Sequence, residues 1–251
     1  MPKFFVMSDI HGFYDEMIQA LDEAGFDESN PDHWVITCGD HFDRGRQPLK
    51  VMRYLRSLPR KVLIRGNHEW LLEDCIDRGY YMSHDCSNGT MQTILDFAPN
   101  YGAFDEACVI AELKTSSFIG SMVNYFETKN YIFVHGWIPL KCEDSLPAYF
   151  ERNRVLSYNP DWRTAHQKEW NDAMWLNGMK MAMQGFLPDK TVVVGHYHTS
   201  WGHARQDKTF NEWGEGADFS PYYADGVIAI DACTAHTGKV NVLVIEDDLN
   251  E

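Results

Sequence analysis

Short apolar runs, each rich in β-branched or aromatic residues and each ending in polar residues, recur along the chain. Five of them lie at residues 4–7, 34–38, 61–64, 131–134 and 191–194, and two more, at 227–230 and 240–245, close the chain. Continuous apolar runs of this length are typical of strands that are buried on both faces of a sheet. The pattern therefore predicts a sheet protein whose strands carry polar groups at their carboxyl ends.

Helical periodicity separates the first three strands. Residues 15–24 have apolar side chains three to four positions apart, and Gly25 can end the helix that they predict. Residues 48–58 repeat the pattern, and Pro59 follows them. This alternation of strand and helix predicts the α/β fold class. In such folds, ligands bind at the carboxyl ends of the strands.

Two longer stretches depart from this alternation. Residues 70–130 are predicted to form a mainly helical insertion after the third strand, with breaks at Asn88-Gly89 and Pro99-Asn100. Residues 141–190 are predicted to be irregular apart from a helix near 170–183. Because no linker or internal repeat divides the sequence, we expect a single domain over residues 1–251.

Composition narrows the class of protein. The 251 residues are 44% hydrophobic, enough for one sizeable core, and carry a formal net charge of −15. That charge argues against binding to a nucleic-acid duplex or an anionic membrane. No apolar run approaches the length of a membrane span or of a signal peptide, and the six cysteines include no CxxC pair. We expect a cytoplasmic protein, and the oligomeric state stays open.

Candidate metal ligands follow the first two strands. Asp9 and His11 come directly after the first strand, and just past a strand end this spacing can aim both side chains at one point. A carboxylate with an imidazole suits Mn, Fe, Co or Zn, although a surface turn explains the pair equally well. Asp40 follows the second strand, where its carboxylate can bridge two metals. Asp43 and Arg44 come next, and their alternative interpretation is a capping aspartate with a local ion pair.

The later strands end in the same kinds of residue. Asn67 offers an amide oxygen that suits a hard cation, or a helix N-cap, and His68 beside it can donate a proton. His135, His196 and His198 follow two further strands, and a single histidine in such a position is usually structural. Ligand-type residues at five successive strand ends make a joint metal site the stronger interpretation.

Taken together, these motifs resemble those of the calcineurin-like metallophosphoesterase superfamily. The patterns DxH, GDxxDRG, GNHE, HG and GHxH occur in order between residues 9 and 198. They look most like the branch that contains serine/threonine phosphoprotein phosphatases and bacterial diadenosine tetraphosphatases. The resemblance implies a four-layer αββα sandwich with two divalent or trivalent transition-metal ions (Mn, Fe or Zn) at its rim.

The resemblance also implies a role for each candidate residue. The first metal would be held by Asp9, His11 and Asp40, the second by Asp40, Asn67, His135 and His196, with His198 as an extra ligand to the first. His68 matches the catalytic histidine, Asp43 its carboxylate partner, and Arg44 the arginine that contacts phosphate.

The predicted activity is metal-dependent phosphoester hydrolysis. The main prediction is a phosphomonoesterase of the serine/threonine protein phosphatase type, acting on a phosphoprotein or a small phosphoester. The alternative is a nucleotide-type substrate, either a dinucleoside polyphosphate or a cyclic phosphodiester. A non-catalytic scaffold on the same fold ranks third, because His68 and every ligand position are intact.

Two features bear on the choice of substrate. Phosphoprotein phosphatases usually have a second phosphate-binding arginine between the last two ligand histidines, and Arg152, Arg154 and Arg163 lie in that interval outside any alignable motif. Aromatic residues could stack on a nucleobase or simply pack in the core. The candidates are Trp70, Tyr80, Tyr81, Trp137 and Trp162.

Overall fold

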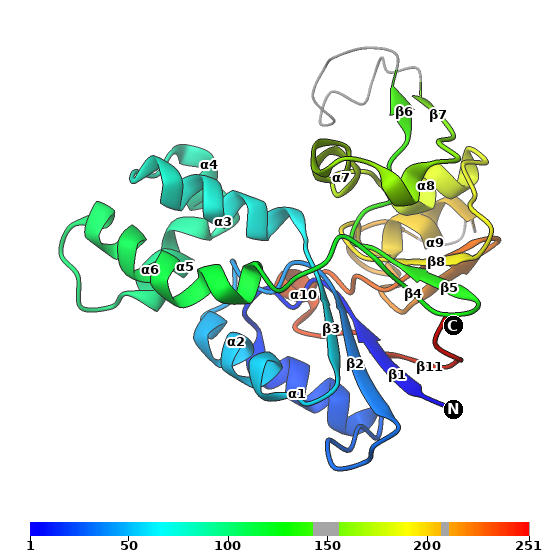
Figure 1. The fold of residues 1–251 in the computed structure, drawn as a ribbon, viewed down its shortest axis with the longest axis horizontal. Helices are drawn as coiled ribbons and strands as arrows, with labels where there is room; N and C mark the ends of the chain where they lie inside the picture. Colours follow the sequence, from blue (N-terminus) through cyan, green and yellow to red (C-terminus); the bar gives the residue numbers. More distant parts are fainter. Residues whose placement is uncertain (143–155, 207–210, 251) are drawn as a thin grey trace.

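The computed structural model describes residues 1–142, 156–206 and 211–250, and two sheets dominate it (Figure 1). The first sheet has the order β11 (Leu243–Glu246), β1 (Lys3–Met7), β2 (His33–Cys38) and β3 (Lys61–Ile64). Strands β1, β2 and β3 are parallel, and β11 runs antiparallel to β1. The parallel pairing places the carboxyl ends of the first three strands at one edge.

The second sheet repeats this arrangement. Its order is β4 (Phe126–Glu127), β5 (Tyr131–Phe133), β8 (Thr191–Val194), β10 (Val227–Ala229) and β9 (Tyr222–Ala224). The three inner strands β5, β8 and β10 are parallel, with antiparallel strands on both sides. A separate two-stranded ribbon joins β6 (Lys141–Cys142) to β7 (Leu156–Ser157).

Helices fill the connections. They are α1 (Tyr14–Glu23) and α2 (Pro48–Ser57) between the first strands; α3 (Asn67–Arg78), α4 (Ser83–Asn88), α5 (Thr90–Phe97) and α6 (Phe104–Ile119) after β3; and α7 (Gln167–Ala173), α8 (Gly178–Met183), α9 (Ser200–Gln206) and α10 (Thr234–Thr237) later. Figure 1 shows α3 to α6 gathered on the side of the molecule away from the second sheet. Among the described residues, no helix combines the length and hydrophobicity needed to cross a bilayer.

Strand β1 shows how the sheets are held. Its side chains alternate between two faces, as in any strand. Phe4 and Val6 join a core cluster shared with Phe133 and Val193 of the second sheet, whereas Phe5 packs in the cluster formed with the helices. Both faces are buried, which explains why the sequence shows a continuous apolar run rather than an alternating one.

The α/β class is confirmed, and the number of layers stays a prediction. Every predicted strand is present, but the last one begins at Leu243 rather than at residue 240. The reason is its partner: Leu243 pairs with Val6 next to the end of β1, so earlier residues have little strand left to pair with. The helix predicted near 170–183 is two helices, because Asn177 starts α8 as an N-cap whose side chain accepts from the Lys180 amide at 3.1 Å.

Candidate metal centre

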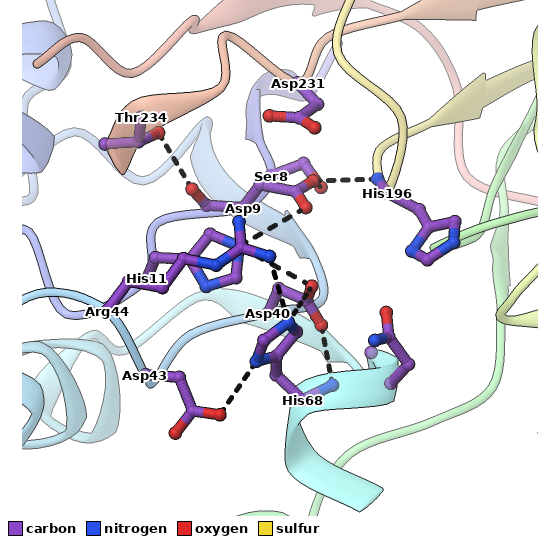
Figure 2. A network of polar contacts seen from close by, with 12 residues as sticks. Ser8, Asp9, His11, Asp40, Asp43, Arg44, His68, His196, Asp231 and Thr234 are labelled. Carbon is purple, nitrogen blue, oxygen red and sulfur yellow. Dashed lines mark hydrogen bonds and ion pairs between the residues drawn. The ribbon is translucent and has the colours of Figure 1, made fainter. Parts of the chain in front are cut away.

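The predicted site residues come together where the loops after β1, β2, β3, β5 and β8 meet (Figure 2). Most of them are almost fully buried: the exposed fraction is 3% or less at Asp9, His11, Asp40, Asp43, Asn67, His68 and His135. Burying so many ionisable groups is costly unless each is paired or binds a cation. The contacts of these groups therefore indicate what the site is built to hold.

The backbone of these loops is strained. In the described part of the chain, seven non-glycine residues have a positive φ, and six of them are candidate site residues: Asp9, His11, Asp40, Asp43, Arg44 and His196. Such conformations are uncommon and cluster at functional sites. Two glycines permit the close approach of the loops. A Cβ on Gly66 would lie 2.2 Å from Asp40 Oδ1, and one on Gly195 would lie 1.8 Å from Ser8 Oγ.

A first group of possible ligands consists of His11, Asp40 and His68, whose donor atoms lie within 4.8 Å of one another. His11 Nδ1 lies 2.9 Å from the Phe42 carbonyl oxygen and must donate to it, which leaves the Nε2 lone pair facing the site. That Nε2 is 3.7 Å from Asp40 Oδ2 and 3.8 Å from Asp9 Oδ1. The backbone carbonyl thus orients His11 as a ligand, in the way that outer partners orient metal-bound histidines.

A second group consists of Asp40, His135 and His196, again with donor atoms within 4.8 Å. His135 Nδ1 donates to the Cys38 carbonyl oxygen at 2.7 Å, so its Nε2 carries a lone pair. This Nε2 faces Asn67 Oδ1 at 2.8 Å and Asp40 Oδ1 at 3.3 Å. Three electron-pair donors converge here, and only a cation between them or a proton on His135 relieves the repulsion. The donor set therefore fits a bound metal ion.

Asp40 belongs to both groups, which is the position that a bridging ligand requires. Burial alone would raise the pKa of Asp40, but His135, His68 and His11 lower it well below its usual range. Burial together with the Asp40 charge raises the pKa of Asp9 to about 6. The site thus holds one carboxyl group that loses its proton readily, Asp40, and one that holds its proton more strongly, Asp9. A bound cation would favour the ionised form of Asp9.

Asp9 lies beside the first group without being part of it. Its Oδ2 accepts hydrogen bonds from the Ser8 hydroxyl at 2.5 Å and from the His196 backbone amide at 2.9 Å. Thr234 secures the same residue through its hydroxyl, which donates to the Asp9 carbonyl oxygen at 2.8 Å. These bonds leave Oδ1 directed toward His11, so Asp9 can still supply one oxygen to an ion held there.

His68 is held by a carboxylate rather than by the ligand groups alone. Its Nδ1 lies 2.7 Å from Asp43 Oδ2, and the Thr90 hydroxyl donates to that same oxygen at 2.7 Å. Burial lowers the pKa of His68, but Asp40 and Asp43 outweigh burial and raise it above its ordinary value. The imidazole is thereby kept as a proton carrier whose Nε2 faces the site.

Arg44 spans the two histidines of the first group. Its Nη1 lies 3.0 Å from His11 Nε2 and its Nη2 lies 3.3 Å from His68 Nε2 (Figure 2). Because a guanidinium stays protonated in proteins, Nη1 donates to the His11 Nε2 lone pair, whereas Nη2 can donate to His68 Nε2 only while that imidazole is neutral. A forked donor at this place can bind two oxygens of one phosphate group.

His198, like Asp9, belongs to neither group, and its side chain contacts residues of a later loop. Its Nε2 lies 3.3 Å from Glu212 Oε1, and its ring packs 4.4 Å from that of Trp213. Glu212 in turn binds Arg205 at 2.8 Å. The role of His198 as a metal ligand therefore stays a prediction.

The described arginine in the interval expected for a second phosphate-binding arginine lies away from the site. Arg163 donates to Glu127 at 2.6 Å and to Asp189 at 2.8 Å, so it belongs to a surface network rather than to the site. Arg152 and Arg154 lie outside the described residues. Trp137 and Trp162 are 1% and 0% exposed, so they pack in the core and cannot stack on a base.

Sequence reasoning missed the role of Glu69. It is fully buried, and its carboxylate accepts from the backbone amides of Gly66 at 2.8 Å, Asp40 at 3.1 Å and His41 at 2.8 Å. The side chain thus joins the loop after β2 to the start of α3. The GNHE motif contains this glutamate, but nothing local to it reveals a partner 28 or 29 positions away.

Comparison with known families and relatives gives a consistent result. The family model described as calcineurin-like phosphoesterase matches residues 2–229. The symmetrical bis(5'-nucleosyl)-tetraphosphatase of Hamiltonella defensa subsp. Acyrthosiphon pisum (strain 5AT) is 38% identical over 66 residues, which cover 26% of this chain and 23% of the relative. The protein of the same name from Aeromonas salmonicida (strain A449) is 43% identical over 70 residues, 28% of this chain and 24% of the relative. The similarity thus spans about a quarter of these relatives.

Solved structures extend the similarity to the whole fold. A presumptive diadenosine tetraphosphatase superposes with a TM-score of 0.53 at 14% identity, covering 98% of this chain and 91% of the other. The cold-active protein-tyrosine phosphatase of a psychrophilic Shewanella species gives 0.53 at 17% identity, covering 98% and 76%. At these identities the likeness supports the arrangement of strands and helices and nothing finer.

Proposed function

The chain belongs to the calcineurin-like phosphoesterase family, and we propose that it hydrolyses a dinucleoside polyphosphate at a two-metal centre. The observation that carries the proposal is the pair of ligand groups that share Asp40, with Arg44 beside His11 and His68 of the first group. We assign the first metal to Asp9, His11 and Asp40. The second is assigned to Asp40, Asn67, His135 and His196. His198 stays outside this set because it contacts Glu212.

Two transition-metal ions bound there would supply Lewis-acid activation of the phosphoryl group and of the attacking water. The described residues supply the rest of the chemistry. Arg44 binds phosphoryl oxygens through its forked donors and holds the phosphorus in position for attack. Water forms the new P–O bond, and the P–O bond to the departing phosphate chain breaks.

The departing oxygen needs a proton, and His68 is the group placed to give it. Asp43 accepts from His68 Nδ1, which leaves the proton on Nε2 available on the side of Arg44. Asp40 and Asp43 raise the pKa of His68 against the effect of burial, so the imidazole holds its proton more strongly than an ordinary histidine does. Thr90 supports this arrangement from α5 by donating to Asp43.

The nature of the substrate rests on the relatives and on Arg163. The curated relatives are named symmetrical bis(5'-nucleosyl)-tetraphosphatases, which favours the nucleotide alternative over the phosphoprotein phosphatase that the sequence led us to expect first. Arg163, the described arginine in the relevant interval, is bound to Glu127 and Asp189. These two observations move the proposal from a phosphoserine residue to a dinucleoside tetraphosphate.

Parallel assays test the proposal. Purified protein in Mn²⁺ is offered diadenosine tetraphosphate, a phosphoserine peptide and bis(p-nitrophenyl) phosphate, with His68→Asn as the matched inactive control. We expect the highest kcat/KM on the tetraphosphate, with ADP as the nucleotide product. A higher kcat/KM on the phosphopeptide would overturn the nucleotide assignment and leave phosphoester hydrolysis standing. No turnover of any ester would overturn the enzymatic assignment itself.

A further inference from the structure

A groove leads away from the second ligand group, and none of the chemistry described above uses it. A small cavity beside His135 and Gly136 is also lined by Arg65 and Asn124. The same two residues line a larger cavity of about 440 Å³, whose wall continues along residues 119–125 to Gln167. Arg65 and Asn124 line both cavities, so the cavities are neighbours, and the smaller one is lined by the proposed metal ligand His135; the two together are called the groove.

The size and lining of this groove suit a small organic molecule. Its volume of about 440 Å³ falls within the roughly 300–1,000 Å³ of small-molecule sites. The wall combines apolar groups such as Ile119 and Met122 with the side-chain amides of Asn124 and Gln167. The Asn124 amide donates to the Gln167 side-chain oxygen at 2.9 Å, so the two amides form a fixed pair of polar groups in the wall of the larger cavity.

Arg65 is the charged residue of the groove. Among the described residues, no carboxylate lines either cavity. The Arg65 guanidinium binds Glu73 of α3 through Nη2, whereas its Nε is buried and has no partner among the described groups. Its backbone is fixed by a hydrogen bond from the Arg65 amide to the Val123 carbonyl oxygen at 3.0 Å. Nη2 of Arg65 is thus paired with Glu73, whereas other N–H groups of the guanidinium have no hydrogen-bond acceptor among the described residues.

The two arginines lie on different sides of the centre. Arg44 contacts His11 and His68 of the first group, whereas Arg65 shares its cavity with His135 of the second. A phosphomonoester offers one phosphate for Arg44 to bind. A chain of several phosphates offers further anionic groups to a second guanidinium, in a protein that otherwise repels anions with a net charge of −15.

We propose that this groove binds the nucleoside phosphate half of the substrate that extends past His135, and that Arg65 binds its phosphate chain. This inference rests on the proposed function, because it assumes a substrate with phosphates beyond the one under attack. It makes Arg65 the residue that distinguishes a dinucleoside polyphosphate from a simple phosphomonoester.

The test compares two substrates in one variant. Arg65→Met removes the charge and the forked donor while keeping a long side chain. A lost charge-assisted hydrogen bond to phosphate costs about 10- to 100-fold in affinity, so kcat/KM on diadenosine tetraphosphate should fall by about that factor, mainly through KM. The loss on p-nitrophenyl phosphate should be at least tenfold smaller. Arg65→Lys, which keeps the charge but not the fork, should recover part of the difference.

Two matched variants separate binding from packing. Arg78 is the last residue of α3, the helix that begins two residues after Arg65. Its side chain is 18% exposed against 21% for Arg65, and it binds Asp74 and Asp85 rather than groove residues. Arg78→Met should change both substrates alike. Glu73→Gln removes the ion-pair partner of Arg65 and leaves the guanidinium, so it should keep the preference for tetraphosphate. If Glu73→Gln reproduced the selective loss of Arg65→Met, Arg65 would be structural and the inference would fail.

A binding measurement separates failure of this inference from failure of the proposed function. Calorimetric titration with ADP, using orthophosphate as the reference ligand, requires no turnover. We expect Arg65→Met to weaken ADP binding about tenfold or more and orthophosphate binding much less. Equal affinities of the wild type and Arg65→Met for ADP would refute the role of the groove in binding, even if tetraphosphate is the substrate. Weaker binding of ADP by Arg65→Met would support that role, even if tetraphosphate were not cleaved.

Discussion

Replacing Glu69 by glutamine tests how the two central loops of the site are held together. The carboxylate accepts from the backbone amides of Gly66 and Asp40 through Oε2 and of His41 through Oε1. The shape of the side chain barely changes in Glu69→Gln. One of its two acceptor oxygens, however, becomes an NH₂ group that faces backbone N–H groups instead of accepting from them.

The size of the effect follows from the number of donors left without an acceptor. If the new amide nitrogen takes the Oε2 position, two donors lose their partner, and if it takes the Oε1 position, one does. Each buried donor left unsatisfied costs about 1–3 kcal/mol, so one or two such donors predict a loss of about 1–6 kcal/mol in the free energy of unfolding. For a chain of 251 residues, that corresponds to a fall of roughly 2–24 °C in Tm.

The pH dependence of stability gives a second readout. Burial alone would raise the pKa of Glu69, but His41 lowers it below the ordinary 4.5. A carboxyl group whose pKa is depressed in the folded state stabilises the fold above its unfolded pKa, and this contribution is lost as pH falls through the folded value. The wild-type protein should therefore lose stability below about pH 4.5 more steeply than Glu69→Gln does.

Urea unfolding at pH 7 and at several acid pH values measures both effects. Glu106→Gln is the control, because Glu106 also lies in the first turn of a helix but is exposed. If Glu69→Gln unfolded at the same urea midpoint as the wild type and as Glu106→Gln, the hydrogen bonds of Glu69 to the two loops would not stabilise the fold as described. A normal midpoint with parallel acid curves would refute both the hydrogen-bond count and the ionised state.

Three further predictions concern the site itself. His68→Asn should lower kcat on diadenosine tetraphosphate by about 10²- to 10⁴-fold while the metal content, measured by elemental analysis, stays normal; unchanged turnover would remove its role as proton donor. Asp40→Asn should cost occupancy at both positions, because Asp40 belongs to both ligand groups, and two tightly bound ions in this variant would refute the bridge. Mn²⁺ binding to metal-free protein should weaken as pH falls below 6, because the pKa of Asp9 is raised to about 6 by burial and by Asp40 and a ligand must lose its proton to bind. A competition titration with a chelator at pH 5 and 7 checks this, and an equally steep pH profile in Asp9→Asn would contradict it.

The fold class and the strand-end positions of the candidate residues could be predicted from the sequence, because both depend on which residues follow one another along the chain. A strand that is buried on both faces shows as an apolar run, and the residue after it lies at the edge of the sheet whatever its partners are. Asp40 and His135 could therefore each be placed at a strand end from the sequence, but not beside each other, because β2 and β5 belong to different sheets. The structure then brings them to 3.3 Å.

Partners chosen by tertiary packing could not be predicted in this way. Thr90 lies in the helical segment after β3, yet it donates to Asp43, 47 positions earlier. His198 follows its strand end like His196, but it contacts Glu212 from a later loop. Arg65 carries no sign in the sequence that it lines a groove, because the groove is completed only when the segment after α6 pairs with the end of β3 through Val123. Long-range contacts of this kind leave no periodic pattern in the chain.

The strained loops connect the residue types of the site to its chemistry. Five of the six site residues with a positive φ are aspartate or histidine, and Arg44 is the sixth. Aspartate and histidine are among the non-glycine residues most often found in that conformation, and they are also common ligands of transition metals. One choice of residue thus serves the tight turn and the metal together. Each strained position still costs about 1–3 kcal/mol, which is large beside a total stability of roughly 5–15 kcal/mol. Metal ions that bind the folded site alone would stabilise it through mass action, so the strain and the buried carboxylates are both best explained by a centre that folds around its cations.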